Sequence, residues 1–72
     1  MLSRIKEPEK LLANWLQLNE VIMTLRESEV EELIAYEREH KARLRVLLRL
    51  YNRFSRLRSI REKRELAKDA KA

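Results

Sequence analysis

The chain has no glycine and only one proline, Pro8, among its 72 residues. Without glycine, a tight turn that needs a positive φ angle must use asparagine or another costlier residue, which disfavours a β-hairpin fold. Leu, Arg, Glu, Lys and Ala dominate instead, and all of them are strong helix formers. A chain of this length buries only ~60% of the surface that it exposes when unfolded, so its stability should be marginal. The composition therefore predicts one small all-α domain with short polar connections.

The hydrophobic periodicity predicts three helices in this domain, over residues 8–20, 26–39 and 42–60. We expect a helical domain of residues 1–57 and a basic C-terminal tail of residues 58–72. The tail has high charge and almost nothing to bury, which is typical of a frayed helix or a disordered segment.

The first helix is predicted to begin at Pro8, whose missing N–H would be unpaired in the first turn anyway. Apolar residues follow at helical spacing, and Trp15 is the largest of them. This spacing predicts that Trp15 lies in the core. Tryptophan is also enriched in interface hot spots, so Trp15 becomes a candidate anchor for a partner if the small domain leaves it exposed.

The second helix is predicted to begin within the segment TLRESEVE, which holds two overlapping Ser/Thr-x-x-Glu capping boxes. Its apolar stripe ends with Tyr36 or the aliphatic stem of Glu37. In the following segment, EREHKAR, only Ala42 is apolar, so the periodic pattern is interrupted for about two turns. The interruption predicts a turn near residues 39–41. One continuous helix over residues 28–66 is the alternative, because nothing here is a strong helix breaker.

The segment RLRVLLRLYNRFSRL, residues 43–57, interleaves arginines with large apolar residues at helical spacing. On a helical wheel with ~3.6 residues per turn, its basic residues share one face with the later Lys63. The apolar residues lie on the opposite face, which is the predicted core side. The basic residues on the first of these faces are Arg45, Arg49, Arg53, Arg56 and Lys63. The apolar face comprises Leu44, Leu47, Leu50, Tyr51, Phe54 and Leu57.

The two halves of the chain carry opposite charge. Residues 1–37 hold four Lys/Arg and eight Asp/Glu, a net charge of −4, and residues 38–72 hold thirteen and four, a net charge of +9. Such asymmetry is typical of proteins that bind nucleic acid or another polyanionic surface. The alternative is intramolecular, with the acidic helix neutralising the basic one. This alternative has less scope beyond Leu57, where Arg58 and Arg61 fall on the formerly apolar face and the core should end.

No catalytic constellation and no Gly-rich phosphate loop is present in the sequence. The single histidine, His40, has no second histidine or cysteine near it that could complete a metal site. We therefore expect a non-enzymatic protein without cofactor or metal. The first residues contain no long apolar run, so we expect neither a signal peptide nor a membrane span, and a cytoplasmic location.

Three modes of interaction are compatible with the basic residues. A helix-turn-helix could present Arg43, Arg45 and Arg49 to the DNA major groove. A basic amphipathic helix could bind an anionic membrane or a protein groove, but its apolar stripe is already needed for the core. We favour the third mode, in which a monomer docks on a protein and the tail arginines contact an acidic surface or nucleic acid. The residues expected to contact a partner are Trp15, Arg45, Arg49, Arg53, Arg56, Arg58, Arg61, Lys63 and Arg64.

The run from Leu25 to Leu66 resembles small proteins encoded by bacteriophages, in its SEVEELIAYE helix, its RLYNRF segment and its LRSIREKR end. Size and charge are also similar to those of a phage transcription regulator that binds host RNA polymerase. This resemblance implies contacts with the polymerase β and β′ subunits, displacement of the σ factor and a capacity for antitermination. We therefore expect an inhibitor or modulator of transcription initiation in the host bacterial cytoplasm. A small basic helix-turn-helix-like DNA-binding protein is the alternative, and a purely structural assembly protein is a third interpretation.

Overall fold

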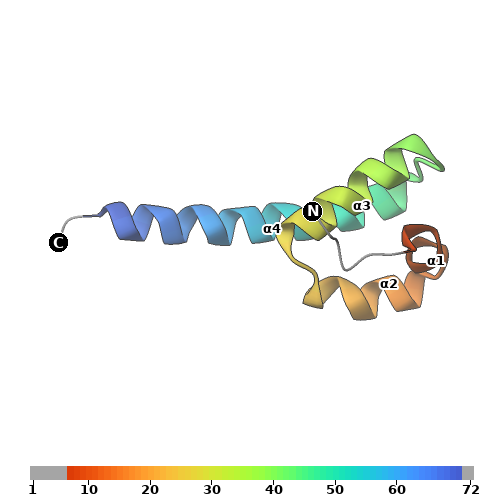
Figure 1. The fold of residues 1–72 in the computed structure, drawn as a ribbon, viewed down its shortest axis with the longest axis horizontal. Helices are drawn as coiled ribbons and strands as arrows, with labels where there is room; N and C mark the ends of the chain where they lie inside the picture. Colours follow the sequence, from red (N-terminus) through yellow and green to blue (C-terminus); the bar gives the residue numbers. More distant parts are fainter. Residues whose placement is uncertain (1–6, 71–72) are drawn as a thin grey trace.

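The computed structural model describes residues 7–70, and this part of the chain is helical without any strand (Figure 1). The all-α class expected from the composition is therefore confirmed. The elements are α1 (Pro8–Ala13), α2 (Trp15–Val21), the short 3-10 helix η1 (Ile22–Thr24), α3 (Glu27–Glu39) and α4 (Leu44–Asp69).

The helix expected over residues 8–20 is divided in two at Asn14. Pro8 does occupy the first turn of α1, as expected. The backbone of Asn14 is extended, with φ −119° and ψ 110°, and its Oδ1 accepts a hydrogen bond from the Gln17 N–H at 3.1 Å. Asparagine caps a helix N-terminus well because its short side chain satisfies an otherwise unpaired amide. The described residues thus contain four α-helices instead of the predicted three.

Helix α3 begins between the two capping boxes suggested by its sequence. Its N-cap is Arg26, whose backbone N–H donates to Glu29 Oε1 at 2.8 Å. Glu29 therefore supplies the reciprocal hydrogen bond of a capping box from the third helical position. The Thr24 hydroxyl donates instead to the carbonyl oxygen of Val21, the last residue of α2, at 2.7 Å.

A short turn separates α3 from α4, so the alternative of one continuous helix does not hold. Ala42 has φ 47°, the one positive φ of a non-glycine residue in the described part of the chain. Its N–H donates to the Glu37 carbonyl oxygen at 2.6 Å and helps to cap the end of α3. A left-handed residue is a common helix end, and glycine normally occupies it. In this glycine-free chain an alanine takes that position, at a cost of about 1 kcal/mol.

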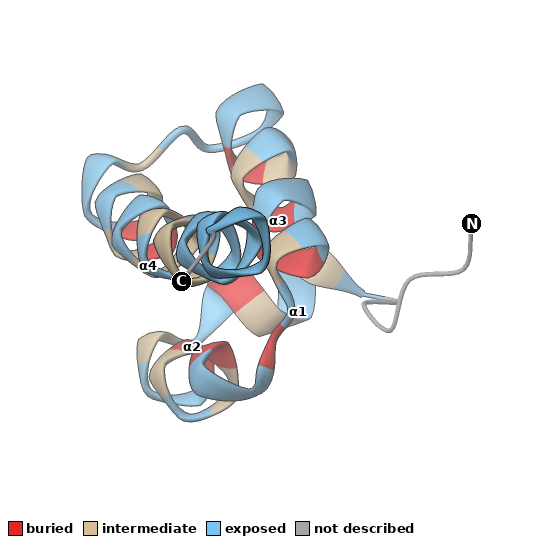
Figure 2. Cartoon of the chain, turned by 90° about the vertical axis from the view of Figure 1, so that its left-hand side faces the viewer, coloured by how far each residue is buried: buried red, intermediate tan, exposed pale blue. Residues whose placement is uncertain are grey.

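The core lies between α3, the first half of α4 and the N-terminal elements, which pack beneath this helical pair (Figure 2). Trp15 is partly buried and packs against the core, in line with its predicted position. The buried apolar residues come from all five elements or their connections: Leu12, Leu18, Ile22, Leu25, Val30, Leu33, Val46 and Leu50.

The buried face of α4 is rotated relative to the predicted one. Val46 and Leu50 are its buried residues, whereas Leu44 and Tyr51 of the predicted core face are exposed. The rotation is roughly 70° toward the arginines on a helical wheel. It is possible because the partly buried Arg49 and Arg53 lie along the N-terminal elements and place their polar ends on acceptors there. Their long stems supply apolar contact area while the guanidinium groups remain hydrogen-bonded.

Helix α4 continues to Asp69, whereas a frayed or disordered tail was expected from residue 58. Figure 1 shows its C-terminal half extending away from the other helices. Every residue from 61 to 70 is exposed, and Arg61, through Glu27, ties the start of this part of the helix to α3. Local forces favour it, because the segment is rich in strong helix formers and contains i,i+4 ion pairs from Arg58 to Glu62 and from Arg61 to Glu65. Residues 71 and 72 of the expected tail lie outside the described residues.

Candidate functional site

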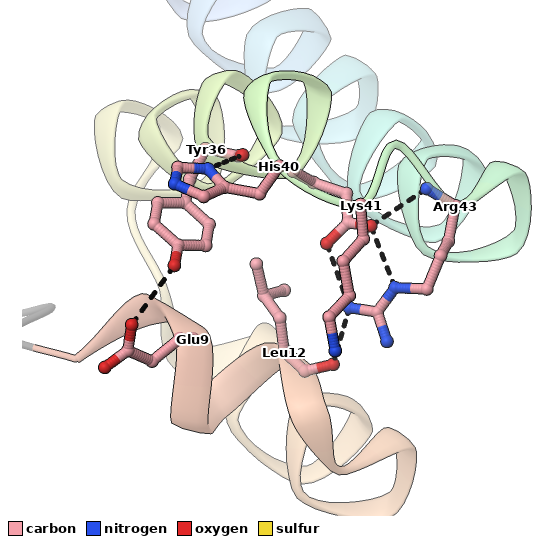
Figure 3. A pocket seen from close by; sticks show the side chains of 7 residues that line it. Glu9, Leu12, Tyr36, His40, Lys41 and Arg43 are labelled. Carbon is pink, nitrogen blue, oxygen red and sulfur yellow. Dashed lines mark hydrogen bonds and ion pairs between the residues drawn. The ribbon is translucent and has the colours of Figure 1, made fainter.

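A pocket of about 240 Å³ opens between α1 and the turn that joins α3 to α4 (Figure 3). Its polar groups are largely occupied by one another. The Tyr36 hydroxyl donates to Glu9 at 3.3 Å, and the Tyr36 ring stacks on His40 with 3.8 Å between the ring centroids. Burial, followed by the neighbouring Glu9 carboxylate, raises the pKa of Tyr36. These contacts in the pocket therefore connect α1 to the C-terminal end of α3.

Glu37 and Arg43 form the most buried ion pair of the described structure. The Glu37 carboxylate accepts hydrogen bonds at 2.9 Å from the backbone N–H, Nε and Nη2 of Arg43. These bonds hold the pKa of Glu37 below its usual range and raise that of Arg43. Arg43 Nη2 also donates to the Leu12 carbonyl oxygen at 2.9 Å. The pair thus joins α3, α4 and α1, and Arg43 is not available to read DNA.

Most of the arginines that were predicted to share one face of α4 contact other residues of the chain. The Arg45 guanidinium lies 4.0 Å from the centre of the Trp15 ring, within range of a cation–π interaction. Arg49 Nε donates to Asn19 Oδ1 at 2.6 Å. The structure therefore brings Trp15 together with Arg45, although the sequence offered no reason to pair them.

Arg53 continues this row of contacts. Its Nη2 donates to the Met23 carbonyl oxygen at 3.1 Å, while its buried Nε has no hydrogen-bond partner. The unpaired Nε is a local cost, because a buried donor loses its water without gaining a partner. Contacts of Arg45, Arg49 and Arg53 together connect the N-terminal elements to α4. These three residues were predicted to contact a partner, and in the structure they contact residues of the same chain. Arg56 is exposed.

Arg61 is the point at which α4 leaves the body of the molecule. Its Nε donates to Glu27 Oε1 at 2.9 Å, and its Nη1 donates to Glu65 Oε1 at 3.0 Å. These two carboxylates raise the pKa of Arg61. The ion pair between Glu27 and Arg61 joins the acidic half of the chain to the basic half. It is an example of the intramolecular neutralisation that was the alternative explanation of the charge asymmetry. Arg58 is paired more loosely, with Glu62 at 3.6 Å.

We call residues 61–69 of α4 the outer segment. Lys63, Arg64 and Lys68 are exposed on it, and none of them forms an ion pair within residues 7–70. On a helical wheel Arg64 and Lys68 continue the core-facing side of α4 beyond the body, and Lys63 lies about 120° away from the centre of that side. We call these three residues the basic face. Lys63 and Arg64 belong to the predicted contact set and Lys68 does not; all three are exposed and free to bind a polyanionic surface, as is Arg56 of the predicted set.

The structure shows two features that the sequence patterns did not single out. Glu37 is the buried counter-ion of the fold, and its only sequence signal was a glutamate at the end of an apolar stripe. Lys68 completes the basic face, and its spacing from Arg64 by one helical turn could have indicated it.

Within the described residues, no group of three or more His, Cys, Asp or Glu side chains is arranged to hold a metal ion. The same part of the chain contains no helix of the length and apolarity that crossing a membrane requires.

Residues 8–60 match the model of a protein family described as a domain of unknown function, DUF8129. The chain therefore belongs to that family. The match ends next to Arg61, so the outer segment lies beyond the matched residues. Neither the curated proteins nor the solved structures contain a match to this chain.

Proposed function

We propose that this DUF8129-family chain is a non-enzymatic transcription regulator that docks on bacterial RNA polymerase through its outer segment. One observation carries the choice of surface. Three arginines of the helical body contact Trp15, Asn19 and Met23, whereas the cations of the basic face lie on the projecting outer segment and have no partner within residues 7–70.

The projecting geometry also supports a docking role. The outer segment lies beyond the body of the molecule, so a partner surface can approach it without displacing a core residue. The basic face would meet an acidic surface on the partner. Such charge complementarity raises the rate of association and sets the orientation of the complex more than it raises affinity. The identity of the partner rests on the resemblance of residues 25–66 to phage proteins. Phage origin, polymerase β and β′ contacts, σ displacement and antitermination all belong to this proposal.

The test is a pull-down of purified bacterial RNA polymerase with the intact chain and two matched variants. Lys63→Glu with Arg64→Glu reverses two cations of the basic face. Arg26→Glu with Arg38→Glu reverses two exposed cations of the body, so the net charge is the same in both variants. We expect the first variant to lose binding and the second to keep it.

Two results would contradict the proposal. If the intact chain does not retain polymerase at low salt, the partner is wrong. If both charge reversals weaken binding equally, net charge drives the association and the outer segment is not the contact. Circular dichroism of both variants at 222 nm shows whether they are folded.

The DNA-binding alternative has less support, because Arg43, Arg45 and Arg49 are engaged by Glu37, Trp15 and Asn19. A duplex shift that falls steeply with salt and is abolished by Arg45→Gln with Arg49→Gln would favour it over polymerase docking.

A further inference from the structure

Positive and negative charges are segregated around the circumference of α4. The acidic residues of this helix, Glu62, Glu65 and Asp69, fall within roughly 60° of one another on a helical wheel. Two of them form ion pairs with the neighbouring Arg58 and Arg61. The remaining part of the circumference, roughly 300°, carries no acidic residue of α4.

A line of polar and basic residues runs along most of this acid-free part of α4. On the wheel its members lie within roughly 60° of one another, about 130° from the core-facing side that holds Val46 and Leu50. All of them are exposed except Ser59, which is half-buried, and the line covers ~27 Å of helix. We call these residues the lateral strip: Arg45, Asn52, Arg56, Ser59 and Lys63.

The three cations of the lateral strip have donors open to a ligand. Arg56 and Lys63 are exposed and form no ion pair within residues 7–70. The Arg45 guanidinium lies 4.0 Å from the centre of the Trp15 ring and donates no hydrogen bond within the same residues. Trp15 therefore orients Arg45 without using its N–H donors.

The composition of the lateral strip fits a phosphate backbone better than a protein or a membrane. Arginine, lysine, serine and asparagine side chains all donate to phosphate oxygens in nucleic-acid complexes. Protein interfaces have a hydrophobic core, and helices that bind membranes insert apolar side chains, but the strip contains no large apolar residue. The nearest ones, Leu48 and Leu66, lie ~27 Å apart along the helix, so no continuous apolar patch accompanies the strip.

A double-stranded nucleic acid fits the strip better than a single strand does. Figure 1 shows α4 as one straight rod, which presents the strip along a line. Single strands are bound by stacking their bases on aromatic side chains, and Trp15, the aromatic residue at the strip, already contacts Arg45. A DNA duplex carries one negative charge per ~1.7 Å of its axis, so each cation of the strip meets a phosphate without a defined register.

We infer that the lateral strip binds the phosphate backbone of a DNA duplex without reading its sequence. No arginine enters a groove in this mode, so Arg43 keeps its pair with Glu37 and Arg49 its bond to Asn19. The inference goes beyond the proposed function, because the strip shares only Lys63 with the basic face. The rest of the basic face can meet a protein while the strip holds DNA.

Fluorescence anisotropy of a short labelled DNA duplex, with the intact chain and without polymerase, measures this binding. Three phosphate contacts predict a slope of about −2.7 for the logarithm of affinity against that of salt concentration, so affinity should fall about 40-fold between about 50 and 200 mM salt. Two duplexes of unrelated sequence should bind alike, because phosphate contacts carry no sequence information. No binding at low salt, or strong preference for one duplex, would overturn the inference.

Two matched variants test the surface. Arg56→Gln removes one cation of the strip and should reduce the slope to about −1.8. Arg58→Gln removes the same charge from another side of the same helix and should leave the slope unchanged. Both arginines are exposed, and circular dichroism checks that both variants keep their helices. An equal effect of the two substitutions would assign the binding to net charge and refute the strip.

Trp15 emission gives an independent readout, because Trp15 is the only tryptophan of the chain and contacts Arg45. Duplex binding should change this emission, and an unchanged emission at saturating duplex would contradict the position of the strip. Arg56→Gln should still be retained by RNA polymerase, since Arg56 lies outside the basic face. A failed polymerase pull-down therefore contradicts the proposed function alone, and failed duplex binding contradicts the strip alone.

Discussion

Replacing Arg43 by methionine removes the charged partner of the most deeply buried carboxylate in the fold. Glu37 is 1% exposed, and two of its three hydrogen bonds from Arg43 come from the guanidinium group. Stranding a buried charge typically costs 3–5 kcal/mol. The Arg43 side chain is 36% exposed, so water can enter the vacated space and lower this cost. We expect a loss of about 2–3 kcal/mol in the free energy of unfolding.

This loss is large for a domain of 72 residues, whose total stability should be roughly 4–11 kcal/mol. With a urea m-value of about 1 kcal/mol per molar, the midpoint should fall by about 2–3 M. The assay is urea unfolding followed by Trp15 fluorescence and by circular dichroism. Arg58→Met is the matched control, because its exposed pair with Glu62 should be worth less than about 0.5 kcal/mol.

A second variant isolates the stranded charge from the lost packing. Combining Arg43→Met with Glu37→Gln removes the buried carboxylate, so the double variant should be more stable than Arg43→Met alone. The reasoning fails if Arg43→Met costs no more than Arg58→Met, or if the double variant is less stable than the single one by the full cost of Glu37→Gln.

The same ion pair predicts a dependence of stability on pH. Hydrogen bonds from Arg43 hold the pKa of the Glu37 carboxyl below its ordinary value of 4.5. The unfolded state therefore binds more protons than the native state in this range, and stability falls as the pH falls below 4.5 and through the native pKa. Glu37→Gln should reduce the loss in urea midpoint between pH ~6 and pH ~3. An equal loss in both proteins would assign it to other groups.

Three further substitutions test the local structure by urea unfolding. Ala42→Gly should stabilise the protein by about 0.5–1 kcal/mol, because glycine adopts the positive φ angle without steric cost; a destabilised variant would contradict the left-handed turn. Asn14→Ala should cost about 1 kcal/mol through loss of the α2 cap, and an unchanged midpoint would show that the cap is dispensable. Leu50→Ala should cost about 3 kcal/mol because Leu50 is fully buried; a cost below that of Asn14→Ala would place the core elsewhere.

Local signals in the sequence were sufficient for the class of the fold and for most helix positions. The lack of glycine predicted helices, Pro8 marked the start of α1, and the interrupted periodicity before Ala42 predicted the turn between α3 and α4. Asn14 was missed because the apolar spacing on either side of it fits an unbroken helix. Because the Asn14 side chain can cap a new helix, a break at Asn14 and an unbroken helix are similar in local free energy. Tertiary packing, which the local sequence does not show, decides between the two.

The roles of the arginines could not be predicted from periodicity, because their partners are distant in sequence. Arg49 and Arg53 each bind a residue 30 positions earlier, and these contacts help to decide which face of α4 is turned inward. Apolar residues cover a wide arc of this helix, so several rotations would bury a comparable stripe. The exposure of Lys63 and Arg64 was easier to anticipate, since the apolar pattern ends before them.

The continuity of α4 past Arg61 fixes the rotational phase between the core and the outer segment. Deleting one residue just beyond Arg61 would turn every later side chain by about 100° around the axis and draw it back by about 1.5 Å. The core would keep its contacts, although the ion pairs of Arg58 with Glu62 and of Arg61 with Glu65 would be lost, and the direction in which Arg64 and Lys68 point would change. A single-residue insertion or deletion is normally harmful within a helix that packs in a core. Beyond Arg61 it would instead change the direction of one surface and leave the core packing unchanged.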